Sequence, residues 1–213
     1  MPTEQEILNS IKGSTNSSKP AEPEPTEDYS KTRETSAFIW ETVKVIIISL
    51  AIILPIRYYL VQPFFVKGAS MEDNLHDGDY LLIDEISYRF NDPKRGDIIV
   101  FRYPENPSQF FIKRIIGLPG ETVEIKNDEV TIYNDDFKQG LKLEENYLSL
   151  NQQTIGNLRS ELDGDEYFVL GDNRLQSSDS RRWGELNKSF ITGKAFLRLW
   201  PFNRLTKIPV ISY

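Results

Sequence analysis

The chain has 213 residues, one histidine and no cysteine, and its formal net charge is -7. This length is enough for one domain with a sizeable core plus shorter flanking segments, so a second large domain is not expected. The lack of cysteine excludes disulfides, thiolate nucleophiles and thiolate metal ligands. The acidic balance argues against a nucleic-acid partner, because phosphate binding draws most of its affinity from Lys and Arg.

The first 36 residues are rich in Ser, Thr, Pro and Glu and contain few large apolar side chains. A segment of this composition buries too little surface to offset the entropy that it would lose on ordering. We therefore expect residues 1–36 to form a disordered tail.

Residues 37–61 form the most apolar segment of the chain. The uninterrupted apolar or small stretch 45–56 is too short to cross a bilayer, but its flanks extend it to about 20 residues, which is enough. Trp40 and Tyr58 are typical of interfacial anchors. The alternatives are a buried core helix and a removable signal peptide, although the latter would lie nearer the N-terminus and end in a small-x-small cleavage site. We predict one transmembrane helix that stays in the mature protein.

Beyond Pro63 the sequence changes to short β-branched and aromatic runs separated by Gly, Pro, Asn and Asp. This pattern is typical of a mostly β domain, which we expect over residues 62–213. A central Lys-Asn-Asp-Glu between two alternating arms predicts a hairpin over 122–133. The other expected strands are 80–84, 97–103, 110–116, 166–170 and 195–200.

Lys113 lies in the apolar stretch QFFIKRIIG. If this stretch is a strand, its period of two places Phe111, Lys113 and Ile115 on one face, so the ammonium group lies between two large apolar neighbours. Desolvation then lowers the pKa of the amine and makes a neutral base available. The alternative for this segment alone is a lysine that reaches past its neighbours to water.

Ser70 follows Gly68 and Ala69 in a turn. Small residues here admit an extended peptide and leave the backbone N–H of Ser70 free to face a developing oxyanion. A hydroxyl becomes a useful nucleophile only when a neighbouring base takes its proton. Because histidine is so scarce in this chain, the amine of Lys113 is the leading candidate for that base.

A third polar segment, 171–185, reads GDNRLQSSDSRRWGE. We expect Asp172 with Arg174, and Asp179 with Arg181, to form bidentate pairs that fix a loop, and the hydroxyl of Ser177 to orient an amine. The alternative is a polar surface loop. No metal site is expected, because His76 stands alone and the acidic run 73–84 has Leu75 where a calcium loop needs an oxygen ligand.

Taken together, these segments resemble type I signal peptidase, a membrane-anchored serine protease, over residues 37–201 in order. The family's nucleophile box is matched by Gly68, Ser70 and Met71 followed by Gly78 and Asp79. Its later boxes are matched by YLLID, by KRGDIIVF with IKRIIGLPGE, by GDNR with SxDSR and WG, and by GKA with the later Trp-Pro. One departure is Asp73-Asn74, where the family usually has Pro-Thr.

The resemblance implies a mostly β fold: a signal-peptidase-like antiparallel β catalytic domain with one N-terminal transmembrane helix. It implies Ser70 as nucleophile, Lys113 as general base, and Ser177 as the residue that holds the Lys113 amine. The other implied residues are Asp179, Arg181, Asp172 and Arg174 as supports and Gly68, Met71, Phe111, Ile112, Leu82 and Ile83 as the substrate-binding set.

The implied reaction is acyl transfer through a serine ester, with no metal or organic cofactor. Substrates should carry small residues at the cleavage position and two before it, since an extended peptide points alternate side chains into the enzyme. The implied partners are preprotein signal peptides, the lipid bilayer and the secretion machinery. The expected location is the cell membrane, crossed once, with the N-terminus in the cytoplasm and the catalytic domain outside.

Two alternatives come from other protein classes. A self-cleaving repressor-type peptidase also uses a Ser/Lys dyad on a β-rich fold, but it would need a DNA-binding N-terminus where this chain has an apolar span. The second alternative is a membrane-anchored β-domain that binds exported proteins without cleaving them.

Overall fold

The structure, a computed structural model, describes residues 27–55, 61–211 and 213. Residues 1–26, most of the predicted tail, lie outside the described residues, as do 56–60 at the end of the predicted span. The first described element is helix α2, Glu27–Pro55. Residues 27–36, which the sequence assigns to the disordered tail, are the first part of this helix. An apolar helix already nucleated downstream extends at little cost.

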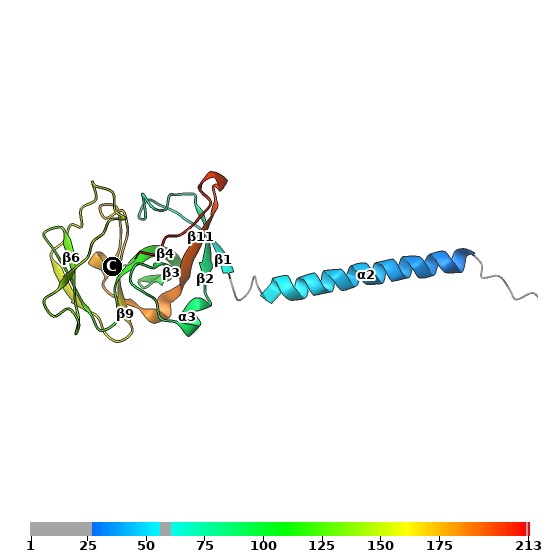
Figure 1. Ribbon diagram of the computed structural model, residues 1–213, viewed down its shortest axis with the longest axis horizontal. Coiled ribbons are helices and arrows are strands. Elements are labelled where there is room, and N and C mark those ends of the chain that lie inside the picture. The colour runs from blue at the N-terminus through cyan, green and yellow to red at the C-terminus, as the bar shows by residue number, and fades with distance from the viewer. Residues whose placement is uncertain (1–26, 56–60, 212) are drawn as a thin grey trace, which may run out of the picture. The chain divides into compact units, whose positions relative to one another are not determined.

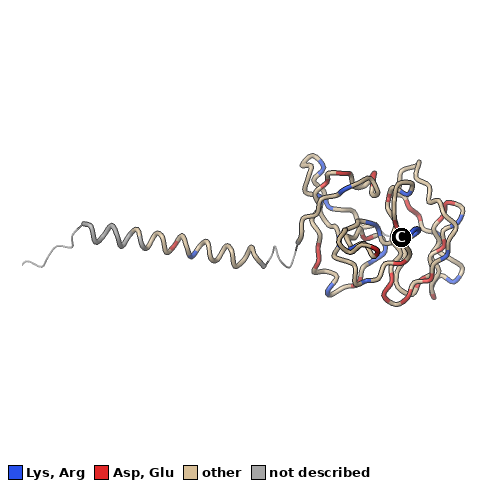
Figure 2. The backbone as a smooth tube through the Cα atoms, turned by 180° about the vertical axis from the view of Figure 1, so that it is seen from behind, with Lys and Arg blue, Asp and Glu red and all other residues tan. Residues whose placement is uncertain are grey.

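Helix α2 carries an apolar stretch, Ala37–Leu54, whose mean hydropathy is 2.2. Its side chains are exposed, and Glu41 and Lys44 are its charged residues, coloured in Figure 2. By length and composition this helix can cross a membrane. It is described as far as Pro55, and the remainder of the predicted span up to residue 60 lies outside the described residues.

The rest of the described chain forms two antiparallel sheets (Figure 1). The larger sheet has the strand order β1-β2-β11-β3-β4-β9-β10, with β12 paired to β11, and the smaller has the order β7-β6-β5-β8. The strands are β1 (Val61–Phe65), β2 (Tyr80–Asp84), β3 (Ile98–Tyr103), β4 (Asn106–Gly117), β5 (Thr122–Lys126), β6 (Glu129–Tyr133), β7 (Leu141–Lys142), β8 (Leu158–Glu161), β9 (Glu166–Leu170), β10 (Leu186–Asn187), β11 (Ile191–Trp200) and β12 (Thr206–Lys207). Short helical turns are α3 (Ser87–Phe90), α4 (Ser180–Trp183), η2 (Lys188–Phe190) and η3 (Phe202–Arg204).

The predicted hairpin is present, with β5 paired to β6 in register from Thr122 and Tyr133 to Lys126 and Glu129. Its two-residue turn, 127–128, has φ angles of 53° and 68°. Asn and Asp tolerate this left-handed conformation, which matches the twist of the flanking strands. The local sequence was therefore sufficient to predict this element.

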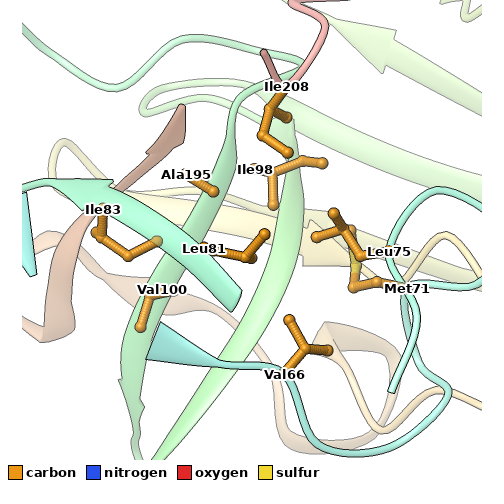
Figure 3. Close-up of a cluster of buried hydrophobic side chains, with 9 residues drawn as sticks. All are labelled: Val66, Met71, Leu75, Leu81, Ile83, Ile98, Val100, Ala195 and Ile208. Carbon is orange, nitrogen blue, oxygen red and sulfur yellow. The ribbon is translucent and has the colours of Figure 1, made fainter. Parts of the chain in front are cut away.

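One core cluster fixes the loop between β1 and β2, which carries Ser70 (Figure 3). Met71 and Leu75 of this loop are fully buried against side chains of β2, β3 and β11. The labelled members are Val66, Met71, Leu75, Leu81, Ile83, Ile98, Val100, Ala195 and Ile208. Because buried side chains in a packed core occupy defined rotamers, the loop is held on both sides of the serine.

Candidate active site

The loop between β1 and β2 brings Ser70 to Lys113 on β4. The Nζ atom of Lys113 lies 2.7 Å from Oγ of Ser70, and it also donates to the carbonyl oxygen of Ile112 at 2.8 Å. Lys113 is only 3% exposed, and it forms no salt bridge with any carboxylate in the described part of the chain. The alternative of a lysine that reaches to water is therefore wrong, and the two groups can exchange a proton directly.

Burial lowers the pKa of Lys113 to about 8, and the negative charges of Asp179 and Asp172 oppose this fall. The apolar surroundings include the ring of Phe111, whose centroid lies 5.4 Å from Nζ. Desolvation disfavours the ammonium form, so the neutral amine is accessible near neutral pH. A lysine with this pKa can act as a general base.

The segment that follows β9 packs against the back of the serine loop. Asn173 donates its backbone N–H to the carbonyl oxygen of Ser70 at 3.1 Å and its side-chain amide to that of Ala69 at 3.0 Å. At Gly171 an added Cβ would lie 2.4 Å from the Ser70 carbonyl oxygen and 2.2 Å from Oγ of Ser177. Only glycine therefore allows this close approach. Asn173 and the role of Gly171 were not anticipated from the sequence.

The predicted pair between Asp179 and Arg181 is formed. Nε and one terminal nitrogen of Arg181 donate to the two carboxylate oxygens at 2.8 and 2.9 Å, and the N–H of Gly171 donates to the same carboxylate at 3.1 Å. Burial acts to raise the pKa of Asp179, but these hydrogen bonds and the charge of Arg181 hold it below its usual value. Asp179 is therefore a buried carboxylate that stays ionised.

Ser177 does not make the hydrogen bond to Lys113 that the resemblance implied. Its buried Oγ has no hydrogen-bond partner of ordinary geometry among the described residues, although it lies near enough to Asp179 to help lower the pKa of that carboxyl. The amine of Lys113 instead donates to the adjacent backbone carbonyl and to Ser70. The role assigned to Ser177 therefore has no contact to support it in this structure.

The predicted ion pair between Asp172 and Arg174 is not formed. Asp172 accepts two hydrogen bonds from Arg114 of β4, at 2.9 and 2.6 Å, and both side chains are 1% exposed. Arg174 instead pairs with both carboxylate oxygens of Glu145, at 2.8 and 2.5 Å. The prediction paired residues that are close in sequence, whereas each of these two arginines binds a carboxylate that is distant in sequence. Arg114 and Glu145 were missed for this reason.

Asn74, at the departure from Pro-Thr, links the serine loop to this buried pair. Its side-chain amide donates to Oδ2 of Asp172 at 2.8 Å and to the carbonyl oxygen of Tyr147 at 3.1 Å. The neighbouring Arg114 guanidinium lies 4.2 Å from the Tyr147 ring centroid. Asn74 therefore connects the serine loop to the segment after β9 through a hydrogen bond to Asp172.

A groove of about 700 Å³ leads to the two reactive groups. Its lining contains two consecutive runs of mostly apolar residues, 64–67 and 109–113, and the rings of Phe64 and Phe110 from these runs are in edge contact, with centroids 5.3 Å apart. The lining residues are Phe64, Phe65, Val66, Lys67, Ser70, Leu81, Val100, Gln109, Phe110, Phe111, Ile112, Lys113 and Ser178.

The predicted substrate-binding residues lie in this groove only in part. Phe111 and Ile112 line it as expected, whereas Met71 and Ile83 are fully buried in the core. Leu82 lies on β2 between two buried neighbours, so its side chain points to the opposite face from the groove residue Leu81. Gly68 does not line the groove, although it lies in the same loop as Ser70. The aromatic wall from β1 was missed because β1 itself was not predicted.

Comparison with known proteins places these features in a family. The family model described as "Signal peptidase, peptidase S26" matches residues 39–200. The chain belongs to this signal peptidase family. A signal peptidase I of Leptolyngbya laminosa is 40% identical over 183 residues, covering 82% of this chain and 87% of the relative. One from Bacillus amyloliquefaciens is 37% identical over 192 residues, covering 85% and 95%.

A crystal structure of a signal peptidase I from Enterococcus faecalis is 35% identical and covers 49% of this chain and 97% of that chain, with a TM-score of 0.41. The expected resemblance to type I signal peptidase is confirmed by the family match and the curated relatives. This signal peptidase is a serine peptidase that removes signal peptides from preproteins, and its apolar helix α2 is consistent with membrane anchoring. The alternatives of a repressor-type peptidase and a non-catalytic binding domain are set aside.

Proposed function

We propose that Ser70 and Lys113 form the catalytic dyad of this signal peptidase, with Ser70 as nucleophile and Lys113 as general base. The observation that carries the proposal is the 2.7 Å separation of their functional atoms in a site where the lysine is almost fully buried. A neutral amine at this distance takes the proton of the hydroxyl as its oxygen attacks the peptide carbonyl. The protonated amine then donates that proton to the leaving amine.

In the second half of the reaction Lys113 again acts first as base and then as acid. Water adds to the serine ester while Lys113 accepts its proton, and the proton returns to Oγ of Ser70 as the acid product leaves. None of these reaction steps requires an oxidant, a reductant or a metal. The pKa of about 8 suits both directions, because the amine must accept and release a proton in each cycle.

The backbone N–H of Ser70 is the proposed oxyanion donor. It makes no hydrogen bond to any backbone or side-chain acceptor in the described part of the chain. Gly68, with φ +86°, has open space where a side chain would begin, and its own N–H is held by Asp77 at 2.7 Å. A peptide can therefore approach the hydroxyl closely, and a fixed donor faces the charge that develops on its carbonyl oxygen.

The supporting residues act through position and charge. Asp179 raises the pKa of Lys113 against the effect of burial, and Arg181 keeps that carboxylate ionised and in place. Asp172 contributes a second negative charge and connects the segment after β9 to β4 through Arg114. Arg174 donates to the carbonyl oxygen of Gly171 at 3.1 Å, which fixes the start of that segment.

The groove supports a preference for small side chains at the cleavage position and two before it. An extended peptide laid between the runs 64–67 and 109–113 would point alternate side chains toward a floor that includes buried Leu81 and Val100. Large side chains would meet a packed core there.

Two variants test the dyad. Replacing Ser70 with Ala, and separately Lys113 with Ala, should each abolish cleavage of a preprotein by the detergent-solubilised full-length enzyme. Lys126→Ala, at an exposed position on β5, is the matched control and should leave turnover intact. Wild-type turnover in either dyad variant would show that the assignment is wrong.

We further propose that α2 spans the cell membrane once, with the N-terminus in the cytoplasm and residues 62–213 outside. Signal peptides themselves carry an apolar segment, so the anchored enzyme and its substrate share the bilayer, where the secretion machinery is a proposed partner. Protease added to intact spheroplasts should digest the catalytic domain. Protection of that domain until the membrane is broken would contradict this orientation.

A further inference from the structure

The substrate groove is positively charged although the whole protein is acidic. Apart from Lys113, the proposed base, its lining includes Lys67 and no Asp or Glu, whereas the chain carries a net charge of -7. Lys67 is exposed and forms no ion pair within the described residues. The Asp77 carboxylate in the same loop binds the N–H of Gly68 and lies beyond ion-pair distance of the Lys67 ammonium. The ammonium at the groove is therefore available to a ligand.

A second cation lies beside the same wall of the groove. The guanidinium of Arg102 lies 5.8 Å from the ring centroid of Phe110, which lines the groove, and Arg102 is exposed without a salt bridge in the described chain. Two unpaired cations and no carboxylate give the groove a positive potential that favours a negative group on the bound peptide.

The position of Lys67 indicates which part of the peptide it meets. The run 64–67 leads away from Ser70, and Lys67 is its member nearest the serine in sequence. Phe64 and Val66 face the core, so alternation places Lys67 on the outer side of this run. An extended substrate has the same alternation: if its small residues point to the floor, the residue between them points outward, at the level of Lys67.

We propose that Lys67 is a specificity-determining residue that favours preproteins with Asp or Glu between the two small residues that precede the cleaved bond. This inference rests on the proposed Ser70/Lys113 dyad, which fixes where the cleaved bond lies. The ion pair forms at an exposed site, so its effect is modest and sensitive to salt. A carboxylate there accelerates cleavage about two- to fivefold over the neutral amide, and an ammonium slows it by a similar factor.

The test uses three peptides that differ only at this residue, carrying Glu, Gln or Lys between two alanines, and the full-length enzyme in detergent. The wild-type kcat/KM should fall in the order Glu, Gln, Lys at low salt, and the three values should converge at about 1 M salt. Lys67→Glu should invert the order, and Lys67→Gln should bring the three values together. Lys126→Glu changes the net charge equally at a distant exposed strand and should keep the wild-type order.

An unchanged order in Lys67→Glu, or equal values for the wild type at low salt, would overturn the inference. So would a Lys67→Glu variant that lowers all three rates by one common factor, because that pattern marks a structural role. The dyad is judged separately, from cleavage of the Gln peptide by Ser70→Ala. Cleavage of this peptide by Ser70→Ala at the wild-type rate would refute the dyad. An unexpected ratio among the three peptides would refute only the specificity.

Discussion

At the scale of single residues, the state of the Lys113 amine depends on two opposing effects. Burial lowers its pKa to about 8, while the carboxylates of Asp179 and Asp172 raise it. The balance leaves an amine that is partly neutral at physiological pH. The charged neighbours therefore adjust the base as well as fixing the loop.

This balance predicts the pH dependence of cleavage. In the proposed mechanism the neutral amine of Lys113 is the reactive form, so kcat/KM should rise with pH through about 8 and then level off. Asp179→Asn removes a charge that raises the pKa of Lys113 and leaves Arg181 unpaired, and both changes favour the neutral amine. The rise in kcat/KM should therefore move to lower pH. A pH series of peptide cleavage measures this shift.

The control for that series is Asp136→Asn, an exposed carboxylate in the turn after β6. It should keep the wild-type profile at the same ionic strength, because an exposed distant charge is screened. A profile for Asp179→Asn that is reduced in height but unmoved along the pH axis would mean that Asp179 only fixes the loop.

Gly171 gives a second prediction at this scale. In Gly171→Ala the new methyl group would lie 2.4 Å from the Ser70 carbonyl oxygen, which is backbone and cannot rotate away. The loop must shift, at a cost of about 1–3 kcal/mol in the free energy of unfolding, and the serine shifts with it. Urea unfolding and kcat measure the two effects. Gly164→Ala, which has open space around it, should change neither greatly.

At the scale of elements, the buried pair between Arg114 and Asp172 joins strand β4 to the segment after β9. Both partners are 1% exposed. Asp172→Ala should therefore destabilise the protein by about 3–5 kcal/mol, because it leaves a buried guanidinium without its counter-charge. Chemical denaturation with matched fluorescence and circular dichroism probes would measure this loss.

The exposed pair between Lys142 and Glu129 offers a matched comparison, since its side chains are 61% and 48% exposed. Glu129→Ala should cost about 0–1 kcal/mol. If the two substitutions cost the same, the buried pair has little influence on how β4 is held.

Local patterns in the sequence predicted those strands that are long and alternate clearly. Strands β2 and β9 were predicted with their observed bounds, and the β5–β6 hairpin follows from its turn residues. Strand β1 was missed because Val61–Phe65 contains a proline and begins at Val61, which was predicted as the last residue of the membrane span. Its conformation depends on pairing with β2, an edge contact that tolerates proline.

The candidate site likewise has features that could be predicted from the sequence and features that could not. The contact between Ser70 and Lys113 could be predicted because a chain with one histidine offers few partners for a serine hydroxyl, and because Lys113 lies in an apolar strand. The ion pairs of the site could not be predicted. Arg114 and Asp172, for example, are 58 residues apart and are brought together by the pairing of β4 with β9. Sequence proximity is a poor guide to partners wherever antiparallel strands bring distant residues together.

At the scale of the whole molecule, the chain divides into two compact units, Met1–Leu50 and Ala51–Tyr213. The three core clusters draw all their members from Val66 and later residues. The apolar side chains of Ala37–Leu54 contribute nothing to these cores and are exposed. We therefore expect residues 61–213 to fold without the helix, to which we assign attachment to the membrane.

Deletion of residues 1–55 tests this division. The shortened protein should unfold cooperatively and cleave a short peptide at a rate similar to that of the full chain, because all groove residues and both dyad residues remain. In flotation with phospholipid vesicles the full chain should rise with the lipid, whereas the shortened protein should remain mostly below, since it lacks the apolar stretch. Loss of cooperative unfolding, or undiminished flotation of the shortened protein, would show that the helix and the catalytic domain do not have these separate roles.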